Sequence, residues 1–448
     1  MGKKEKGLSA GQLTMLALGT VIGGSFFLGS SVAIHAAGPA ILIAFIFGGL
    51  LVYLILFALS EMTATNPDSG SFRTFAAEVF GPGAGFVVGW VYWTGMVLAM
   101  SSEATAVSIL LRQWFPNLSI ALLGSFIIVI VTGLNLLGAD KLSRLESSLA
   151  AVKIIAIISF IIIALLIITG AFKGASSIGA GALINEPLVP GGIKGLAGSM
   201  LIVIFSYAGF EVIGLASSET ENPQVTVPRA ITYTVISLVS LYILSVLVLL
   251  PLIPTALLSE NMSPMVAALD RWGIRWAGNV LNIVLITAIL STMLAAMFGL
   301  GRMIRSLAGG GQAPKFLDDK KDIPYRGILF SGFAMMLALG VGLLFPRVYL
   351  FLISSGGFAL LFTYASILAT HIRYRKKHGC PDGKCKVPGY PYSSWAALIS
   401  MVIIIFSMPF IPGQVSGLIA GLVIIALYTL IYIAKKLTDR FEKKQLTK

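Results

Sequence analysis

The chain has 448 residues, of which 57% are hydrophobic and 11% are charged. Typical soluble domains carry about 25% charged residues, so this composition excludes a disordered chain, a disulfide-rich secreted scaffold and a soluble enzyme, and indicates a membrane protein. The formal net charge of +13 would suit a nucleic-acid binder, and the positions of the basic residues decide whether that interpretation holds.

A helix that crosses a lipid bilayer needs about 20 predominantly apolar residues. Apolar runs of this length recur along the whole chain, so the sequence predicts an all-α membrane protein with twelve transmembrane helices. The predicted spans are Leu13–Ala37, Ala40–Ser60, Gly83–Leu111, Ser119–Gly138, Leu149–Gly170, Lys194–Ser217, Arg229–Leu252, Trp276–Arg302, Gly327–Phe345, Tyr349–Ile372, Trp395–Phe410 and Val415–Ala434.

The basic residues fix the predicted orientation, because cytoplasmic loops of membrane proteins carry an excess of Lys and Arg. With the N-terminus inside, the inner segments carry 25 of the 32 basic residues and the outer segments carry six, while Lys153 lies within a span. We therefore expect a multi-pass protein of the cell (plasma) membrane, with cytoplasmic tails at residues 1–12 and 435–448. Since no loop is long enough to form a basic domain, we expect no nucleic-acid partner.

Two predicted spans contain glycine-rich interruptions at matching depth. The first span carries Gly19-Thr20-Val21-Ile22-Gly23-Gly24-Ser25, and the sixth carries Phe205-Ser206-Tyr207-Ala208-Gly209-Phe210-Glu211. Interruptions at corresponding places in two halves of a chain indicate the binding site of a secondary transporter. Residues 13–170 and 171–372 would then be inverted repeats, followed by an addition at residues 373–434. Close helix packing through small residues is the alternative explanation.

An unwound helix frees backbone groups that can bind a ligand. Freed amides at the N-terminal end of a half-helix favour an anion such as a carboxylate, whereas freed carbonyls favour an ammonium group. An anion site close to a cation site matches the head group of an α-amino acid. The candidate substrate-binding residues are Val21, Ile22, Gly23, Gly24, Ser25, Phe205, Ser206, Tyr207, Ala208 and Gly209.

Charged side chains inside a membrane are costly, so each one is a functional candidate. Lys153 lies within the fifth span, and because burial disfavours the charged form of a lysine, it could gain and lose a proton during transport or occupy the place of a metal cation. Alternatively, it could reach the inner interface. Glu103 and Glu211 could bind a cationic substrate, relay protons or be protonated structural groups. Glu61 ends the second span and could simply reach the interface.

Three other patterns have weaker chemical support. Cys380 and Cys385 lie near two histidines, but the spacing fits no common zinc site, and Gly309-Gly310-Gly311 lacks the lysine and hydroxyl residue of a phosphate-binding loop. We therefore expect no metal, no nucleotide and no cofactor. Glu219 and Arg73 could form an ion pair at an inner gate, or they could be ordinary solvated loop charges.

Several short motifs follow one another along the chain, and their order matters as much as their presence. They are Gly19 to Ser30 with Ala37-Gly38-Pro39, Pro67 to Phe72, Glu103, Phe205 to Glu211, Ser218 to Pro223 with Pro228-Arg229-Ala230, Asn282 to Arg302, Ala313-Pro314-Lys315 and Val387 to Pro391. Together they resemble the amino acid–polyamine–organocation superfamily, and specifically its bacterial and fungal amino acid permease branch. The resemblance covers nearly the whole chain.

The resemblance implies a LeuT-like fold, in which a five-plus-five inverted repeat is followed by two extra helices. It implies that the substrate carboxylate meets amides of the first span and that the substrate amine meets carbonyls of the first and sixth spans. It also implies that Lys153 stands where sodium-coupled relatives hold a sodium ion, which favours proton symport or exchange. Two departures from the branch, Gly23-Gly24-Ser25 in place of Gly-Thr-Gly and Leu294 in place of an asparagine, favour small or neutral substrates.

The sequence therefore predicts a secondary active transporter of L-α-amino acids, which works by alternating access and is not an enzyme. Its expected partners are the amino acid substrate, protons and the lipid bilayer. A carrier of polyamines or other organic cations, with Glu103 and Glu211 meeting the cation, is an alternative within transport. A proton-channel subunit of a membrane complex is an alternative of another class, although such subunits usually carry several buried ionisable residues in series.

Overall fold

The computed structural model describes residues 7–65, 71–171, 177–215, 220, 222–319, 323–380 and 386–446. Within these ranges the regular structure is helical, apart from one isolated β-bridge between Leu8 and Thr220. The helices are α1 Ala10–Val21, η1 Ser25–Gly29, α2 Ser30–Ala37, η2 Gly38–Ala40, α3 Ile41–Thr65, α4 Ser71–Phe80, α5 Pro82–Leu111, α6 Ile120–Asn135, α7 Ala139–Ile168, η3 Gly181–Asn185, α8 Gly192–Ser206, α9 Val212–Leu215, α10 Pro223–Leu249, η5 Thr255–Leu257, α11 Pro264–Arg271, α12 Arg275–Gly309, η6 Lys315–Leu317, α13 Tyr325–Gly342, α14 Val348–His378, α15 Tyr392–Ser407, η7 Met408–Phe410 and α16 Val415–Leu446.

Each of the twelve predicted spans coincides with helix in the described part of the chain, which confirms the all-α architecture there. Nine helical segments in that part are long and apolar enough to cross a membrane, and α1, α6 and α8 are shorter apolar helices. One of the nine, Ser25–Thr63, joins the end of the first predicted span to the second, because only the short η2 separates α2 from α3. Twelve separate crossings therefore remain a prediction.

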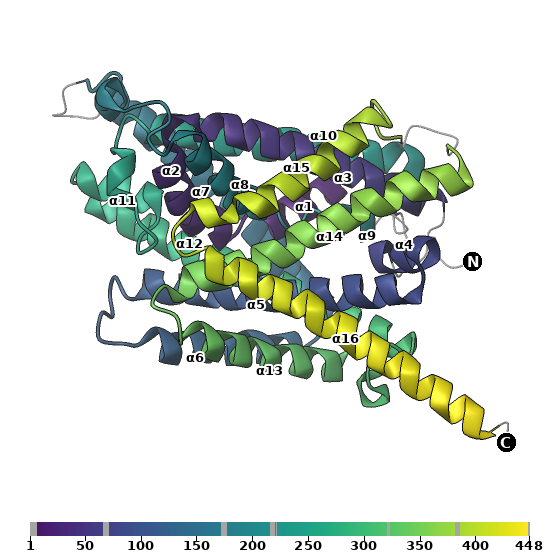
Figure 1. Cartoon of the computed structure of the whole chain (residues 1–448). Helices are drawn as coiled ribbons and strands as arrows, with labels where there is room; N and C mark the ends of the chain where they lie inside the picture. The colour runs from purple at the N-terminus through teal and green to yellow at the C-terminus, as the bar shows by residue number, and fades with distance from the viewer. Residues whose placement is uncertain are drawn as a thin grey trace, which may run out of the picture.

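Two helices form the centre of the bundle. α5 packs against α14, and every residue from Val97 to Leu110 in α5 and from Tyr349 to Leu361 in α14 is buried. Helices that are buried on all sides belong to the interior of a large bundle. By contrast, α16 crosses the outside of the bundle near α5 and α14 (Figure 1) and exposes large apolar side chains such as Leu422. Such a surface is suited to lipid rather than water.

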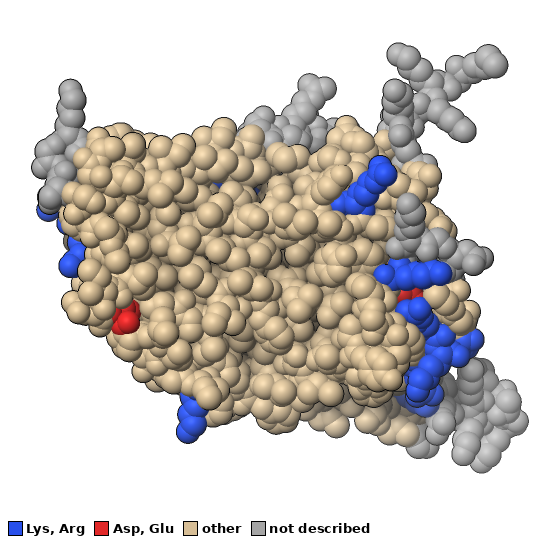
Figure 2. Space-filling view, turned by 90° about the horizontal axis from the view of Figure 1, so that it is seen from above, with Lys and Arg blue, Asp and Glu red and all other residues tan. Residues whose placement is uncertain are grey.

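Charged side chains gather toward the ends of the helices. In the described residues seen in Figure 2, the middle of the face is almost free of Lys, Arg, Asp and Glu, and most basic side chains lie at one end. The C-terminal ends of α14 and α16 and the short α4 lie at that end (Figure 1), and the last turn of α14 alone carries Arg375, Lys376, Lys377 and His378. An apolar belt between charged ends is expected for helices that cross a bilayer.

Candidate functional site

The first predicted helix break is present between α1 and η1. α1 ends at Val21, and Ile22 has extended backbone angles, with φ −71° and ψ 104°. Gly23 forms a bend, and the chain becomes helical again at Gly24, which caps the π-helical turn η1. All residues from Val21 to Ser30 are buried. The interruption therefore lies in the interior of the protein, where irregular backbone can be tolerated at membrane depth.

The second predicted break separates α8 from α9 and meets the first break. α8 ends at Ser206, and Gly209 in the following turns has φ +102°, a conformation that favours glycine. The Thr20 hydroxyl lies 3.2 Å from the Gly209 carbonyl oxygen, within hydrogen-bond distance, and 2.9 Å from the Ala17 carbonyl oxygen of its own helix. A Cβ atom on Gly209 would lie only 2.9 Å from the Thr20 carbonyl oxygen. The absence of a side chain at Gly209 therefore lets the two interrupted spans touch.

Backbone carbonyls of the second break already accept hydrogen bonds from the protein. The Phe205 carbonyl accepts from the Ala208 amide at 3.0 Å, and the Ser206 carbonyl accepts from the Tyr242 hydroxyl at 2.8 Å. The Tyr207 hydroxyl donates to a backbone carbonyl of α3 at 2.9 Å. Since a carbonyl oxygen has two lone pairs, Phe205 and Ser206 can each accept a second hydrogen bond.

Lys153 holds the end of α1. Its side chain is fully buried, and its ammonium group donates to the Gly19 carbonyl at 2.6 Å and to the Thr292 hydroxyl at 2.8 Å. The Thr292 hydroxyl in turn donates to the Ile22 carbonyl at 3.1 Å. These contacts connect α7 and α12 to the first break, and they show that the alternative in which Lys153 reaches the inner interface is wrong.

Glu103 reaches the first break from α5. Its carboxylate is buried and accepts a hydrogen bond from the Gly24 amide at 2.7 Å. A Cβ atom on Gly24 would lie 2.5 Å from that carboxylate oxygen, so a side chain at this position would push the Glu103 carboxylate away from the amide. On the other side, the Tyr349 hydroxyl donates to the Gly24 carbonyl at 3.3 Å. One of the amides expected to bind an anion thus binds a carboxylate of the protein itself.

Glu211 supports the second break from within. Its buried carboxylate accepts hydrogen bonds from the Gly209 amide at 3.1 Å, the Tyr92 hydroxyl at 3.0 Å and the Tyr364 hydroxyl at 3.3 Å. Because Tyr92 lies in α5 and Tyr364 in α14, this carboxylate fastens the break to the centre of the bundle.

Sequence reasoning missed the partners of the buried charges. Thr292, Tyr92 and Tyr364 lie in predicted spans, where single hydroxyl groups are common and carry little signal. A polar side chain at membrane depth would have been the available clue, because it needs a hydrogen-bond partner there. The residues next to them in the sequence do not indicate which buried charged side chain each hydroxyl group contacts.

The predicted inner gate is described only in part. Arg73 in α4 donates to the Gln312 side-chain oxygen at 2.8 Å and to the Ser306 hydroxyl at 3.2 Å. Its predicted partner Glu219 lies outside the described residues, so this ion pair stays a prediction. Close in sequence to Glu219, Thr220 forms the β-bridge that connects the segment before α1 with the segment after α9.

Glu61 does not reach out of the protein, so the possibility that it simply extends to the membrane interface does not hold. Its carboxylate is buried and accepts from the Val387 amide at 2.8 Å, and it lies 3.3 Å from His371 Nε2 and from Arg375 Nε. The Arg375 guanidinium in turn lies over the Tyr390 ring, 4.1 Å from its centroid. This cluster joins α3, α14 and the chain before α15.

The arrangement at the breaks gathers several polar groups inside the protein. It combines backbone amides and carbonyls with the two carboxylates of Glu103 and Glu211 and the ammonium of Lys153. Across the described ranges, no group of three or more His, Cys, Asp or Glu residues is placed to hold a metal ion.

Comparison with known proteins identifies the family. The family model for amino acid permeases matches residues 12–448. The chain is 33% identical over 435 residues to the uncharacterized amino acid permease YtnA of Bacillus subtilis (strain 168), with 94% of each chain covered. It is 30% identical over 455 residues to the gamma-aminobutyric acid permease of the same strain, with 99% of this chain and 97% of the relative covered. It is also 30% identical over 415 residues to the aromatic amino acid transport protein AroP of Escherichia coli O157:H7, with 92% and 91% covered. The resemblance found in the sequence is thus confirmed, and the chain belongs to the amino acid permease family, whose members are integral membrane transporters and not enzymes.

Proposed function

We propose that the protein is a secondary active transporter of L-α-amino acids with small or neutral side chains, and that it binds its substrate where the two helix breaks meet. The observation that carries this proposal is the 3.2 Å contact between the Thr20 hydroxyl and the Gly209 carbonyl, which joins the breaks. The relatives named for gamma-aminobutyric acid and for aromatic amino acids support an amino acid substrate.

The substrate carboxylate would bind the amides from Ile22 to Ser25. Since Glu103 already contacts the Gly24 amide at 2.7 Å, the incoming carboxylate would displace the Glu103 carboxylate, as two anions cannot share one amide favourably. Glu103 would then be available to meet the substrate amine or to take up a proton. The second lone pairs of the Phe205 and Ser206 carbonyls, together with the carbonyls of Val21 and Ala208, would complete the amine site.

Lys153 would couple transport to protons. As an ammonium group it ties Gly19 of α1 to α7 and, through Thr292, to α12. Loss of the proton would weaken both hydrogen bonds, because a charged donor binds more strongly than a neutral one. The end of α1 would then be free to move when the binding site changes from one side of the membrane to the other. We propose proton symport or proton-linked exchange on this basis.

The proposed layout follows from the same breaks. Residues 13–170 and 171–372 would form the two inverted repeats of a LeuT-like core with twelve crossings in total, and residues 373–434 would add the last two. Both termini would lie in the cytoplasm, at the end of the bundle where basic side chains gather (Figure 2). Glu219 and Arg73 would form the inner gate.

An aromatic wall beside the first break supports a neutral substrate. Phe26 in η1 stacks on Tyr242 with ring centroids 3.8 Å apart, and Phe45 packs edge-on against both rings. A polyamine carrier would need free carboxylates instead. Glu211 already accepts three hydrogen bonds from the protein, which leaves Glu103 alone to meet a polyamine, so the structure favours the amino acid.

Uptake into proteoliposomes tests the proposed function. Purified protein would be reconstituted and supplied with labelled glycine, alanine, serine, phenylalanine, γ-aminobutyric acid and putrescine. We expect uptake or exchange of at least one small neutral α-amino acid and none of putrescine. Transport of γ-aminobutyric acid alone would refute the α-amino acid assignment, and transport of putrescine alone would favour the organic-cation carrier. Transport of none of the six compounds would refute the proposal as a whole.

A further inference from the structure

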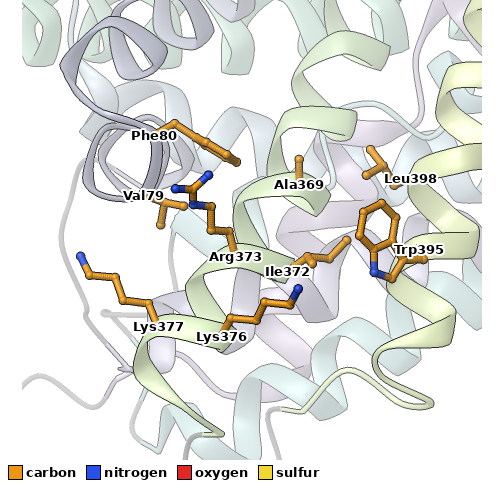
Figure 3. A pocket seen from close by; sticks show the side chains of 9 residues that line it. All are labelled: Val79, Phe80, Ala369, Ile372, Arg373, Lys376, Lys377, Trp395 and Leu398. Carbon is orange, nitrogen blue, oxygen red and sulfur yellow. The ribbon is translucent and has the colours of Figure 1, made fainter.

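A surface pocket that is separate from the helix breaks lies between α4, α14 and α15. Its volume is about 730 Å³, and nine residues line it (Figure 3). These residues are Val79, Phe80, Ala369, Ile372, Arg373, Lys376, Lys377, Trp395 and Leu398. Two of the lining elements, α4 and the C-terminal part of α14, lie at the end of the bundle where basic side chains gather (Figures 1 and 2).

The lining divides into an apolar part and a basic part. Ile372 is buried, while the large rings of Phe80 and Trp395 remain 46% and 47% exposed. Arg373 points toward α4, where its guanidinium lies 5.3 Å from the centroid of the Phe80 ring, and Lys376 extends toward α15 (Figure 3). A basic head between apolar walls can bind a molecule with an anionic group and a hydrocarbon chain.

Two of the three basic side chains that line the pocket form no ion pair within the described part of the chain. Among the described residues, Arg373 and Lys376 have no ion-pair partner, and Lys377 has only Glu78 at 3.9 Å, which also contacts His378 at 2.7 Å. Both Arg373 and Lys376 are exposed. An anion placed between them would gain favourable electrostatic energy without breaking an existing ion pair.

An apolar stripe leads from the pocket along α15. Trp395, Ile399, Val402 and Phe406 are 47%, 53%, 41% and 73% exposed, and spacings of four, three and four residues place them on one face of the helix. The stripe starts within the pocket and runs toward the middle of the apolar belt. A hydrocarbon chain could therefore follow it into the bilayer, whereas an acidic peptide or a nucleotide would gain nothing from it.

We propose that this pocket binds an anionic phospholipid of the leaflet that faces the basic end of the bundle. Arg373 and Lys376 hold the phosphate, Trp395 marks the level of the head group, and an acyl chain lies along the exposed stripe of α15. Basic pockets between transmembrane helices on the cytoplasmic side are suited to anionic head groups, and tryptophan favours the membrane interface. This site is independent of the proposed substrate and of the coupling ion.

Native mass spectrometry of the purified full-length protein tests the lipid site. The protein would be mixed with phosphatidylglycerol or with phosphatidylcholine of the same chain length, and the retained lipid counted. We expect phosphatidylglycerol to be retained at least tenfold more tightly. The double variant Arg373→Gln/Lys376→Gln should lose this preference, by about fivefold for each charge removed. The matched control is Arg302→Gln/Lys436→Gln, which removes two exposed basic groups of the described chain outside the pocket and should retain the preference.

Two further measurements complete the test. A competition experiment distinguishes binding of the whole lipid from binding of its phosphate group, and a single variant ensures that a loss of binding is not caused by misfolding. Inorganic phosphate and glycerol 3-phosphate should not compete with the lipid at equal concentration, because neither carries an acyl chain. The single variant Lys376→Gln, which changes one exposed side chain, should fold and still bind phosphatidylglycerol about fivefold more weakly. Equal retention of both lipids by the wild type, equal loss in the control variant, or full competition by either small phosphate would each overturn the proposal.

Discussion

Single buried charges determine how the first break is held. A buried ammonium group without partners would be strongly destabilising, and Lys153 avoids that cost through the Gly19 carbonyl and the Thr292 hydroxyl. Both partners are connected to the break. Gly19 lies in α1 just before it, and the Thr292 hydroxyl also donates to the Ile22 carbonyl within it. We therefore expect a change in the charge of Lys153 to affect the position of α1.

Replacing Lys153 with alanine should abolish accumulation of substrate that is driven by a proton gradient. Exchange of substrate that is driven only by the substrate's own concentration gradient should continue. The physical reason is that the group proposed to take up and release the proton is gone, while the backbone groups of the substrate site remain. We expect uptake driven by an inward proton gradient to fall at least tenfold in proteoliposomes. Lys194→Ala, which removes an exposed lysine near Phe410, is the matched control and should accumulate substrate normally. Unchanged accumulation by the Lys153 variant would exclude it as the coupling residue.

The two helix breaks depend on glycine for different physical reasons. Gly24 lets the Glu103 carboxylate approach the backbone, whereas Gly209 supplies a positive φ and a close contact with the carbonyl of Thr20. In each case a side chain would either separate the elements or strain the turn. The contact between the breaks therefore depends on the backbone of both interrupted spans.

Gly209→Ala should strain the second break and separate it from the first. A residue with a side chain at φ +102° costs about 1–3 kcal/mol, and its Cβ would press on the Thr20 carbonyl. We expect a lower thermal unfolding temperature and at least a tenfold loss of uptake. Gly299→Ala on α12 is the control, since a Cβ there meets nothing within 4 Å, and it should be neutral or slightly stabilising. Equal behaviour of the two variants would contradict this role for Gly209.

The sequence predicts the elements of the site better than the contacts between them. Glycine runs and apolar length are local properties, so both breaks are found at the predicted residues. The contact of Lys153 with Thr292 joins residues that are 139 positions apart, and local pattern carries no information about such pairs. Glu61 shows the same limit, because its position at the end of a span suggests an interface residue, while packing of α14 buries it against His371 and Arg375.

At the scale of the whole molecule, the proposed orientation rests on the basic end of the bundle. Basic side chains cluster where α4 and the ends of α14 and α16 lie (Figures 1 and 2), and the positive-inside rule assigns that end to the cytoplasm. The same end carries the pocket proposed to bind an anionic phospholipid (Figure 3). The same cluster of basic side chains would thus determine both the orientation of the protein in the membrane and its binding of an anionic phospholipid.

Thiol labelling tests this orientation directly. The chain has two cysteines, Cys380 and Cys385, and Cys380 is exposed just after α14. A membrane-impermeant maleimide should label inside-out membrane vesicles and leave intact cells unlabelled, because the proposed topology places the basic end in the cytoplasm. The variant Cys380→Ser/Cys385→Ser should remain unlabelled in both. Labelling of intact cells would reverse the proposed topology.

Binding of substrate analogues tests the central claim, that the joined breaks recognise the head group of an α-amino acid. Thermal unfolding of the purified protein would be followed with the transported amino acid, with its carboxamide and with its N-acetyl derivative, since a ligand that binds the folded state raises the unfolding temperature. We expect stabilisation by the amino acid alone, because the carboxamide lacks the anion for the amides of the first break and the N-acetyl derivative lacks the ammonium for the carbonyls. Equal stabilisation by either derivative would contradict the account.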